Sequence, residues 1–211
     1  MISEKFKMLA KIIIGLLLIQ GARVVIKLIV FCFVEKSQFT DTIVSALFMA
    51  AMAFVGIIIA GKKGVSLSFL PAKHKAIYTI VTVVAMALLV STPFITGDKS
   101  FFAVAVLIYA GVITPIFEEL IFRGYLWNKL EEKFGGRFAA YIITTLLFAV
   151  WHLGYIDTVA FRMTSGSLAF AMLMKVVTGL FFGIVLGAVR YKTKNCYSTI
   201  ILHGVMNIFG R

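Results

Sequence analysis

Seven apolar segments alternate with short polar ones along this chain of 211 residues. A helix needs about 20 apolar residues to cross the hydrocarbon core of a bilayer. On that criterion the sequence predicts spans at residues 8–34, 39–60, 76–96, 101–127, 137–154, 168–189 and 196–209. The last is short and could be tilted or re-entrant. No connection is long enough for a soluble domain, so we expect an all-α, polytopic transmembrane helical bundle of about seven helices, with any catalytic cavity inside the bilayer.

Composition and loop charge support this assignment. The chain is 61% hydrophobic and 14% charged, whereas soluble domains are about a quarter charged. With the N-terminus inside, thirteen Lys and Arg fall in inner segments and four in outer ones, the bias that cytoplasmic loops show. The basic N-terminus leads into an apolar run without a small-residue cleavage site, which indicates an uncleaved first span. We expect an integral protein of a prokaryotic cell membrane, with its N-terminus cytoplasmic and its C-terminus outside.

The net charge of +12 does not indicate a nucleic-acid partner. The basic residues are scattered singly through short loops instead of clustering on one face, and anionic lipid explains them better. Cys32 and Cys196 lie in different apolar segments without CxxC spacing, so neither a disulfide framework nor a cysteine metal site is supported.

Polar side chains in the first span repeat at helical spacing: Gln20, Arg23 and Lys27 share one face. They could contact lipid headgroups or an acid in the bundle. We favour a polar stripe that faces protein, with long stems that snorkel. An interfacial amphipathic helix is a third possibility and would reset the topology.

Two other features favour structural interpretations. A GxxxGxxxG ridge in the sixth span lets helices approach closely, so it predicts a packing face, although it could also serve a dimer; its members are Gly179, Gly183 and Gly187. Lys175, one turn earlier, could pair with an acid, but its place near the outer end favours snorkelling. His74 lies in a basic loop and is expected to be solvated.

Three charges stand close together in the fourth span, in the stretch PIFEELIFR: Glu118, Glu119 and Arg123. Because a charge at bilayer depth is costly, an intramembrane acid is by default a hypothesis of function. Adjacent residues point about 100° apart on a helix, so the two acids are expected to have different roles. Arg123 follows Glu119 by four residues and can hold that carboxylate ionised and in place.

Two later spans add polar pairs, each four residues apart on one helix face: Phe148 with His152 in FAVWH, and His203 with Asn207 in HGVMN. Glu can act as general base on a water that a neutral His shares, and a second His with an Asn amide can donate to the oxyanion of amide hydrolysis. One geometric difficulty arises, because His152 comes out roughly 20 Å from the cytoplasmic end of its span, against roughly 15 Å for the glutamate and 10 Å for His203.

Structural alternatives stay open for each of these residues. The glutamates and Arg123 could form a buried ion network, and the two histidines could be satisfied core residues. For Phe148, a packing role is favoured over a role in the reaction. Asn207 could join helices by hydrogen bonds.

The motifs EExxxR, FxxxH and HxxxN, in this order on successive core helices, resemble those of the CPBP intramembrane proteases. This family includes the CAAX prenyl-protein endopeptidase and bacterial proteins linked to bacteriocin self-immunity. The resemblance covers residues 114–209 and includes Gly124. It implies that Glu118 and His152 activate water, that His203 and Asn207 form the oxyanion site, and that Glu119 and Arg123 support them. It also implies a division into three N-terminal spans, residues 1–100, and a catalytic core, residues 101–211.

The expected function is thus an intramembrane endopeptidase acting on a membrane-associated or lipidated peptide or protein. A prenylated tail, a signal or pheromone peptide and a membrane-protein segment all stay possible as substrate. Zinc on Glu118, His152 and His203 is conceivable, but HExxH is absent and Asn is a poor zinc ligand, so no cofactor is favoured. A non-catalytic immunity or scaffold protein that binds a peptide or partner is the alternative. A proton-coupled transporter is weaker, because no paired broken helices occur in two matching halves.

Overall fold

The protein, seen here in a computed structural model, is described over residues 2–71 and 73–209. Within these ranges it consists of helices and loops and contains no β-strand. Six helices are long and apolar enough to cross a membrane, and a shorter apolar helix, Tyr197–Phe209, makes a seventh. The predicted all-α, polytopic membrane bundle is confirmed.

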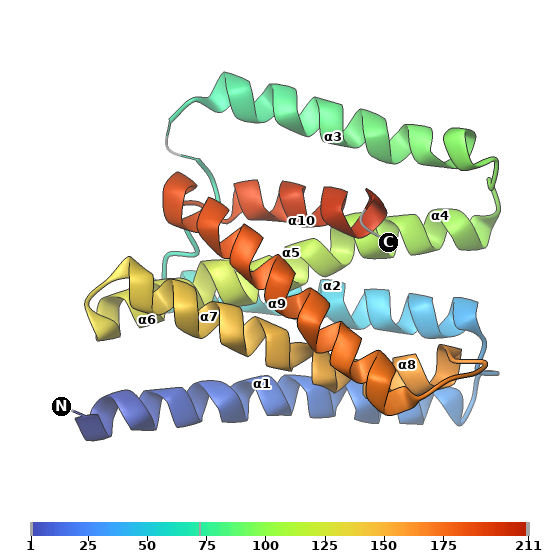
Figure 1. Ribbon diagram of the computed structural model, residues 1–211, viewed down its shortest axis with the longest axis horizontal. Helices are drawn as coiled ribbons and strands as arrows, with labels where there is room; N and C mark the ends of the chain where they lie inside the picture. Colours follow the sequence, from blue (N-terminus) through green and yellow to red (C-terminus); the bar gives the residue numbers. More distant parts are fainter. Residues whose placement is uncertain (1, 72, 210–211) are drawn as a thin grey trace.

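The first three helices run in alternating directions (Figure 1). They are α1 (Ile2–Phe31), α2 (Gln38–Lys62) and α3 (Lys75–Thr96). α2 begins with a capping box, in which the side chains of Ser37 and Thr40 each accept from the other's backbone N–H. α3 packs against α10 and α4 and has a single buried residue, Leu89. α1 and α2 lie closer to the core.

The fourth span is one helical rod, Phe101–Phe134, with two π-helical stretches. In order it comprises α4 (Phe101–Ile108), η1 (Tyr109–Ile113), α5 (Thr114–Glu119), η2 (Leu120–Leu126) and α6 (Trp127–Phe134). Pro115 follows η1 and has no N–H to give to the preceding turn. π-bulges of this kind are frequent at functional sites, and these two flank the glutamate pair.

The fifth span extends beyond its predicted end at residue 154. α7 (Arg137–Trp151) tightens into a 3-10 turn, η3 (His152–Tyr155), and continues as α8 (Ile156–Arg162). The polar residues of α8 hide this extension from an apolar-run criterion, since Asp157 and Arg162 are charged. The predicted end of the fourth span, residue 127, is likewise too early, because the charges on one face of α6 interrupt the apolar run. The predicted bounds of the first span, 8–34, lie too far toward the C-terminus, because the helix begins at Ile2 and ends at Phe31.

The sixth and seventh spans are α9 (Leu168–Thr193) and α10 (Tyr197–Phe209). α9 crosses α7 obliquely (Figure 1) and packs along it. A Cβ on the glycine ridge would come within 2.7 Å of His152 at Gly179, 3.0 Å of Thr145 at Gly183 and 2.5 Å of Tyr141 at Gly187. The ridge is therefore a packing face within the chain, as predicted. Lys175 lies on the exposed side of α9.

Large aromatic side chains fill the core between these helices. Phe117, Phe122, Trp127, Phe148 and Trp151 are all at most 5% exposed and belong to one cluster. Partly buried residues of α1 pack against it, among them Met8, Ile12, Leu16 and Ile19. The N-terminal helix therefore covers one side of the core that carries the glutamates.

Candidate active site

Glu118 is buried and held by two aromatic donors. Its Oε1 accepts from the Trp151 Nε1–H at 3.0 Å and from the Tyr155 hydroxyl at 2.6 Å, and Trp151 Nε1 also lies 3.0 Å from the Tyr155 oxygen. The carboxylate itself is 1% exposed. Trp151 is the last residue of α7 and Tyr155 the last residue of η3, so this turn fixes the orientation of Glu118. Its other oxygen, Oε2, lies 3.8 Å from His203 Nε2.

Glu119 is held by ionic partners instead. Its Oε1 lies 2.9 Å from Arg123 Nη1 and 3.0 Å from His203 Nδ1, and all three side chains are at most 2% exposed. The guanidinium also lies over the Phe148 ring, 4.2 Å from its centroid, and reaches the carbonyl oxygen of Gly183 at 3.4 Å. The i+4 pairing predicted for Glu119 and Arg123 is therefore present in the structure.

His203 lies between the two carboxylates. A carboxylate only accepts hydrogen bonds when ionised, so the contact with Glu119 places a hydrogen on His203 Nδ1. Nε2 then faces Glu118 and is a donor only when the ring carries both protons. The adjacent glutamates thus share one histidine while their other partners differ.

His152 and Phe148 complete the aromatic side of the site. His152 Nδ1 donates to the Phe148 carbonyl at 2.8 Å, which leaves the Nε2 lone pair of the neutral ring free to accept a proton. The Phe148 ring packs edge-on against His152 at 4.9 Å and His203 at 5.8 Å between centroids. The His152 ring also lies 5.9 Å from that of Tyr155, the donor to Glu118. The depth difference expected from helix rise therefore does not keep His152 out of the cluster around Glu118.

Asn207 is joined to the helix that carries the glutamates. Its Nδ2 donates to the Ala110 carbonyl in η1 at 2.9 Å, an acceptor that Pro115 cannot serve. One turn earlier on α10, a Cβ at Gly204 would lie 2.3 Å from the Gly111 carbonyl oxygen. This close approach needs glycine at 204 and seats α10 against η1. Asn207 therefore forms a hydrogen bond between helices, one of the roles proposed for it from the sequence. This bond uses one of its two amide hydrogens.

Trp151 and Tyr155 were missed from the sequence. An indole and a phenol are ordinary in membrane helices, so neither stands out in the sequence as a charged side chain does. A usable signal exists, since both carry a hydrogen-bond donor inside an apolar helix, four residues apart and flanking His152.

Arg190 was missed as well. It is 3% exposed on α9, and its Nε donates to the Arg123 carbonyl at 2.8 Å while Nη2 donates to Asn128 Oδ1 at the same distance. It supports the backbone of η2 close to the site.

The residues do not form an obvious metal site. Within the part of the chain that the structure describes, no three His, Cys, Asp or Glu side chains converge as ligands. His203 gives Nδ1 to Glu119, and His152 gives Nδ1 to a carbonyl. The zinc set Glu118, His152 and His203 thus gains no support, and catalysis without a metal stays a prediction.

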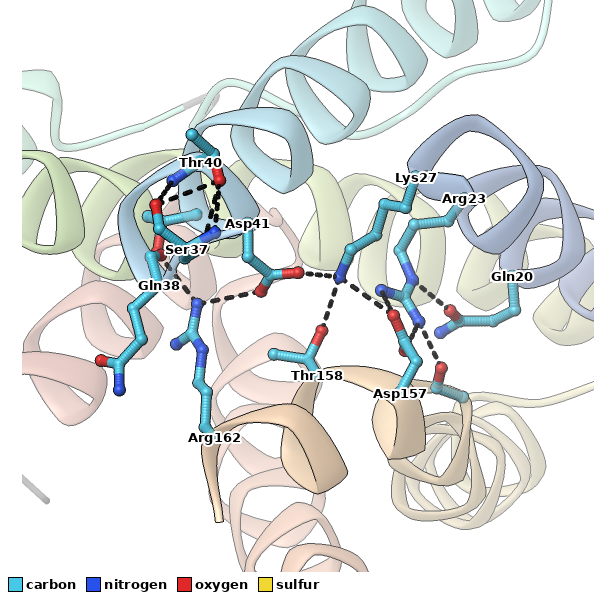
Figure 2. A network of polar contacts seen from close by, with 12 residues as sticks. Gln20, Arg23, Lys27, Ser37, Gln38, Thr40, Asp41, Asp157, Thr158 and Arg162 are labelled. Carbon is cyan, nitrogen blue, oxygen red and sulfur yellow. Dashed lines mark hydrogen bonds and ion pairs between the residues drawn. The ribbon is translucent and has the colours of Figure 1, made fainter. Parts of the chain in front are cut away.

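The polar stripe of α1 faces protein, as predicted, but its long stems do not snorkel: Arg23 and Lys27 are buried and pair with acids of the bundle, which was the less favoured alternative. Figure 2 shows Arg23 directed at Asp157 and Lys27 between Asp157 and Asp41, with Arg162 on the far side of Asp41. Asp41 is fully buried. His74 is exposed before α3, in line with its expected solvation.

Taken together, fold and site define a polytopic integral membrane protein with a buried Glu, His and Arg cluster at the centre of its C-terminal helices. A family model described as Type II CAAX prenyl endopeptidase Rce1-like matches residues 100–209. The chain belongs to this family, which confirms the resemblance seen in the motifs.

One curated relative is similar to the chain. UPF0177 protein YxdF of Lactococcus lactis subsp. lactis (strain IL1403) is 27% identical over 100 residues, 47% of this chain and 45% of that protein. The chain thus matches slightly less than half of that relative's length. No solved structure matches. The family match begins at residue 100, but the division into two regions at that point stays a prediction.

Proposed function

We propose that this protein is an intramembrane endopeptidase that hydrolyses a peptide bond of a membrane-associated or lipidated substrate. The observation that carries the proposal is the buried Glu118 carboxylate, oriented through Oε1 by Trp151 and Tyr155, with Oε2 toward His203. A buried intramembrane acid whose hydrogen-bond donors are neutral is costly, and it is by default a hypothesis of function. The family's description favours a prenylated C-terminal tail as the substrate class.

Water activation is assigned to Glu118 and His152. Glu118 takes a proton from water through Oε2, the oxygen that carries neither aromatic donor, while the Nε2 lone pair of His152 orients the same water. The hydroxide adds to the scissile carbonyl carbon. Glu118 then returns the proton to the leaving nitrogen as the carbon–nitrogen bond breaks. The sum is one water consumed and one acid and one amine formed, with no cofactor in any step.

The oxyanion is assigned to His203 and Asn207. His203 donates from Nε2 in its doubly protonated form, which the neighbouring carboxylate of Glu119 accommodates through Nδ1. Asn207 donates the amide hydrogen that Ala110 does not take. Removal of one oxyanion donor costs about 10²- to 10³-fold in rate in enzymes of this mechanistic type. Glu119 and Arg123 hold this histidine and are positioning residues.

The test compares membrane and secreted peptides, by mass spectrometry, from cells that carry the wild-type protein, Glu118→Ala or His152→Ala. Peptides produced by the wild type are expected to disappear in both variants while both stay folded and inserted. Identical peptide sets in all three strains would contradict the proposal. A phenotype that survives Glu118→Gln would instead support the binding alternative.

A further inference from the structure

A second buried polar cluster, in which residues from outside the family match bond to residues inside it, touches the turn that carries the site. Its members come from α1, α2 and α8 (Figure 2), and they are Gln20, Arg23, Lys27, Asp41, Asp157, Thr158 and Arg162. We propose that Gln20, Arg23 and Lys27 of α1 are positioning residues that fix the His152–Tyr155 turn, and with it the donors to Glu118. The inference rests on the proposed endopeptidase function.

The turn offers backbone acceptors that α1 fills. The internal hydrogen bonds of a 3-10 turn are poorer than those of an α-helix. At the His152–Tyr155 turn, two backbone carbonyls accept hydrogen bonds from side chains of α1. Gln20 Nε2 donates to the Trp151 carbonyl at 3.4 Å, and Arg23 Nη2 donates to the Gly154 carbonyl at 2.5 Å. A Cβ at Gly154 would lie 2.3 Å from the Gln20 amide carbon. The side chains of α1 therefore rest directly on the backbone of the turn.

Arg23 contacts the turn and its neighbours through several atoms of its guanidinium group. Its Nε donates to Gln20 Oε1 at 2.9 Å and its Nη1 to Asp157 Oδ2 at 3.2 Å. Its guanidinium lies 5.1 Å from the centroid of the Tyr155 ring. Tyr155 is the residue whose hydroxyl donates to Glu118 at 2.6 Å. One buried cation thus connects the turn's backbone, the first residues of α8 and the phenol that orients the proposed base.

The remaining members hold Arg23 and Asp157 in place. Lys27 Nζ lies 2.6 Å from Asp41 Oδ1, 3.0 Å from Asp157 Oδ2 and 2.8 Å from the Thr158 hydroxyl. Arg162 closes the far side through Asp41 at 3.2 Å and the Thr42 hydroxyl at 2.9 Å. The cluster therefore ties the start of α2 and the whole of α8 to α1.

Stability alone does not account for such a cluster. Apolar side chains of similar volume would often stabilise a buried site as well as an ion network does, because desolvation offsets the Coulomb attraction. What the network adds is a single geometry for a short, otherwise weakly bonded turn. That geometry is the one that points Trp151 and Tyr155 at Glu118.

The test measures kcat and KM on a peptide that the wild type cleaves and Glu118→Ala does not. Arg23→Met is expected to lower kcat about 10- to 100-fold, the size of effect that a misplacement of about 1 Å produces, and to leave KM within about twofold. Lys7→Met is the matched control, since Lys7 lies on the same helix, is exposed and forms an ion pair with Glu4 of its own helix. It is expected to change neither constant.

A charge-balanced variant separates positioning from folding. Arg23→Met with Asp157→Asn keeps the net charge of the cluster, so thermal stability is expected to return to that of the wild type while kcat stays low. A purely structural cluster would recover both. Arg23→Lys, which keeps the charge but not the fork, is expected to recover kcat only in part.

Fluorescence gives a readout that does not need turnover. The chain has two tryptophans, so Trp127→Phe leaves Trp151 as the sole tryptophan, which is excited selectively at wavelengths that tyrosine does not absorb. Arg23→Met in that background is expected to shift Trp151 emission to the red, and Lys7→Met is expected to leave it unchanged. Unchanged emission and a kcat within twofold of wild type in Arg23→Met would overturn the positioning role. Cleavage that survives Glu118→Ala would instead overturn the proposed function, and the emission would still report on the turn.

Discussion

At the scale of single residues, the two adjacent glutamates are distinguished by their partners. Glu118 is bonded to the neutral donors of Trp151 and Tyr155, whereas Glu119 is bonded to Arg123 and His203. Neutral donors orient a carboxylate and leave its charge uncompensated, and an ion pair compensates the charge. This difference is the physical reason for assigning proton transfer to Glu118 and support to Glu119.

Loss of the Tyr155 hydroxyl should slow the reaction without unfolding the protein. A hydrogen bond to a charged group contributes about 1.5–3 kcal/mol, so Tyr155→Phe is expected to lower kcat about 10- to 100-fold. Steady-state cleavage by the purified protein measures this. Tyr141→Phe is the control, because its hydroxyl donates to the Ile184 carbonyl away from the glutamates. Equal activity of Tyr155→Phe and wild type would show that the phenol does not orient the base.

Glu119→Gln should lower stability in addition to weakening the contact that holds His203. It leaves the fully buried Arg123 without its carboxylate, and breaking a buried pair in this way costs about 3–5 kcal/mol. The thermal unfolding midpoint in detergent is expected to fall clearly. The double variant Glu119→Gln with Arg123→Met removes the orphaned charge and should recover most of the loss. A single variant as stable as the wild type would argue against the ion pair.

At the scale of elements, the contact between α10 and η1 sets the position of His203. Gly204 lies next to that histidine, and a Cβ there would meet the Gly111 carbonyl oxygen at 2.3 Å. Backbone cannot yield as a flexible side chain can. The helix must therefore move as a unit if this position is filled.

Gly204→Ala is accordingly expected to reduce cleavage at least 100-fold by displacing His203 and Asn207. Gly56→Ala is the matched control, since this glycine lies in α2 with nothing within 4 Å of its added Cβ. Replacement of a helical glycine by alanine there should leave activity unchanged and slightly raise stability. A fully active Gly204→Ala variant would contradict the close seating of α10.

The lengths of the apolar runs predicted all seven spans, because each span is buried or faces lipid along its length. The same criterion ended the fifth span before α8, since Asp157 and Arg162 find their counter-charges on α1 and α2, far away in sequence. The three motifs identified the residues around Phe148. Trp151, Tyr155 and the bridging position of His203 depend on the tilt of α7 and on the π-helical stretches, which a single sequence does not specify.

At the scale of the whole molecule, the N-terminal helices are more than an anchor. The family match covers residues 100–209, yet α1 supplies side chains to the core and to the turn before α8. The C-terminal helices therefore depend on partners that the matched region lacks.

A variant that lacks residues 1–37 is expected to be inactive and to unfold at lower temperature. Removal of this segment would take away Arg23 and Lys27, the two cations that pair with Asp157. It would also expose the core face that Leu16 and Ile19 cover. Co-expression of the missing segment as a separate chain should restore part of the activity. Full activity of the truncated protein alone would show that α1 is dispensable.

The most direct measurement of the central claim follows oxygen from water into product. Membranes that hold the wild-type protein, Glu118→Gln or Glu132→Gln are incubated in ¹⁸O-water, and both the released and the membrane-bound cleavage fragments are analysed by mass spectrometry. Glu132 is exposed on α6 and serves as the control. We expect peptides with one ¹⁸O at a new C-terminal carboxyl in the wild type and Glu132→Gln, and none of them in Glu118→Gln. The same labelled peptides in all three membranes would contradict hydrolysis by Glu118.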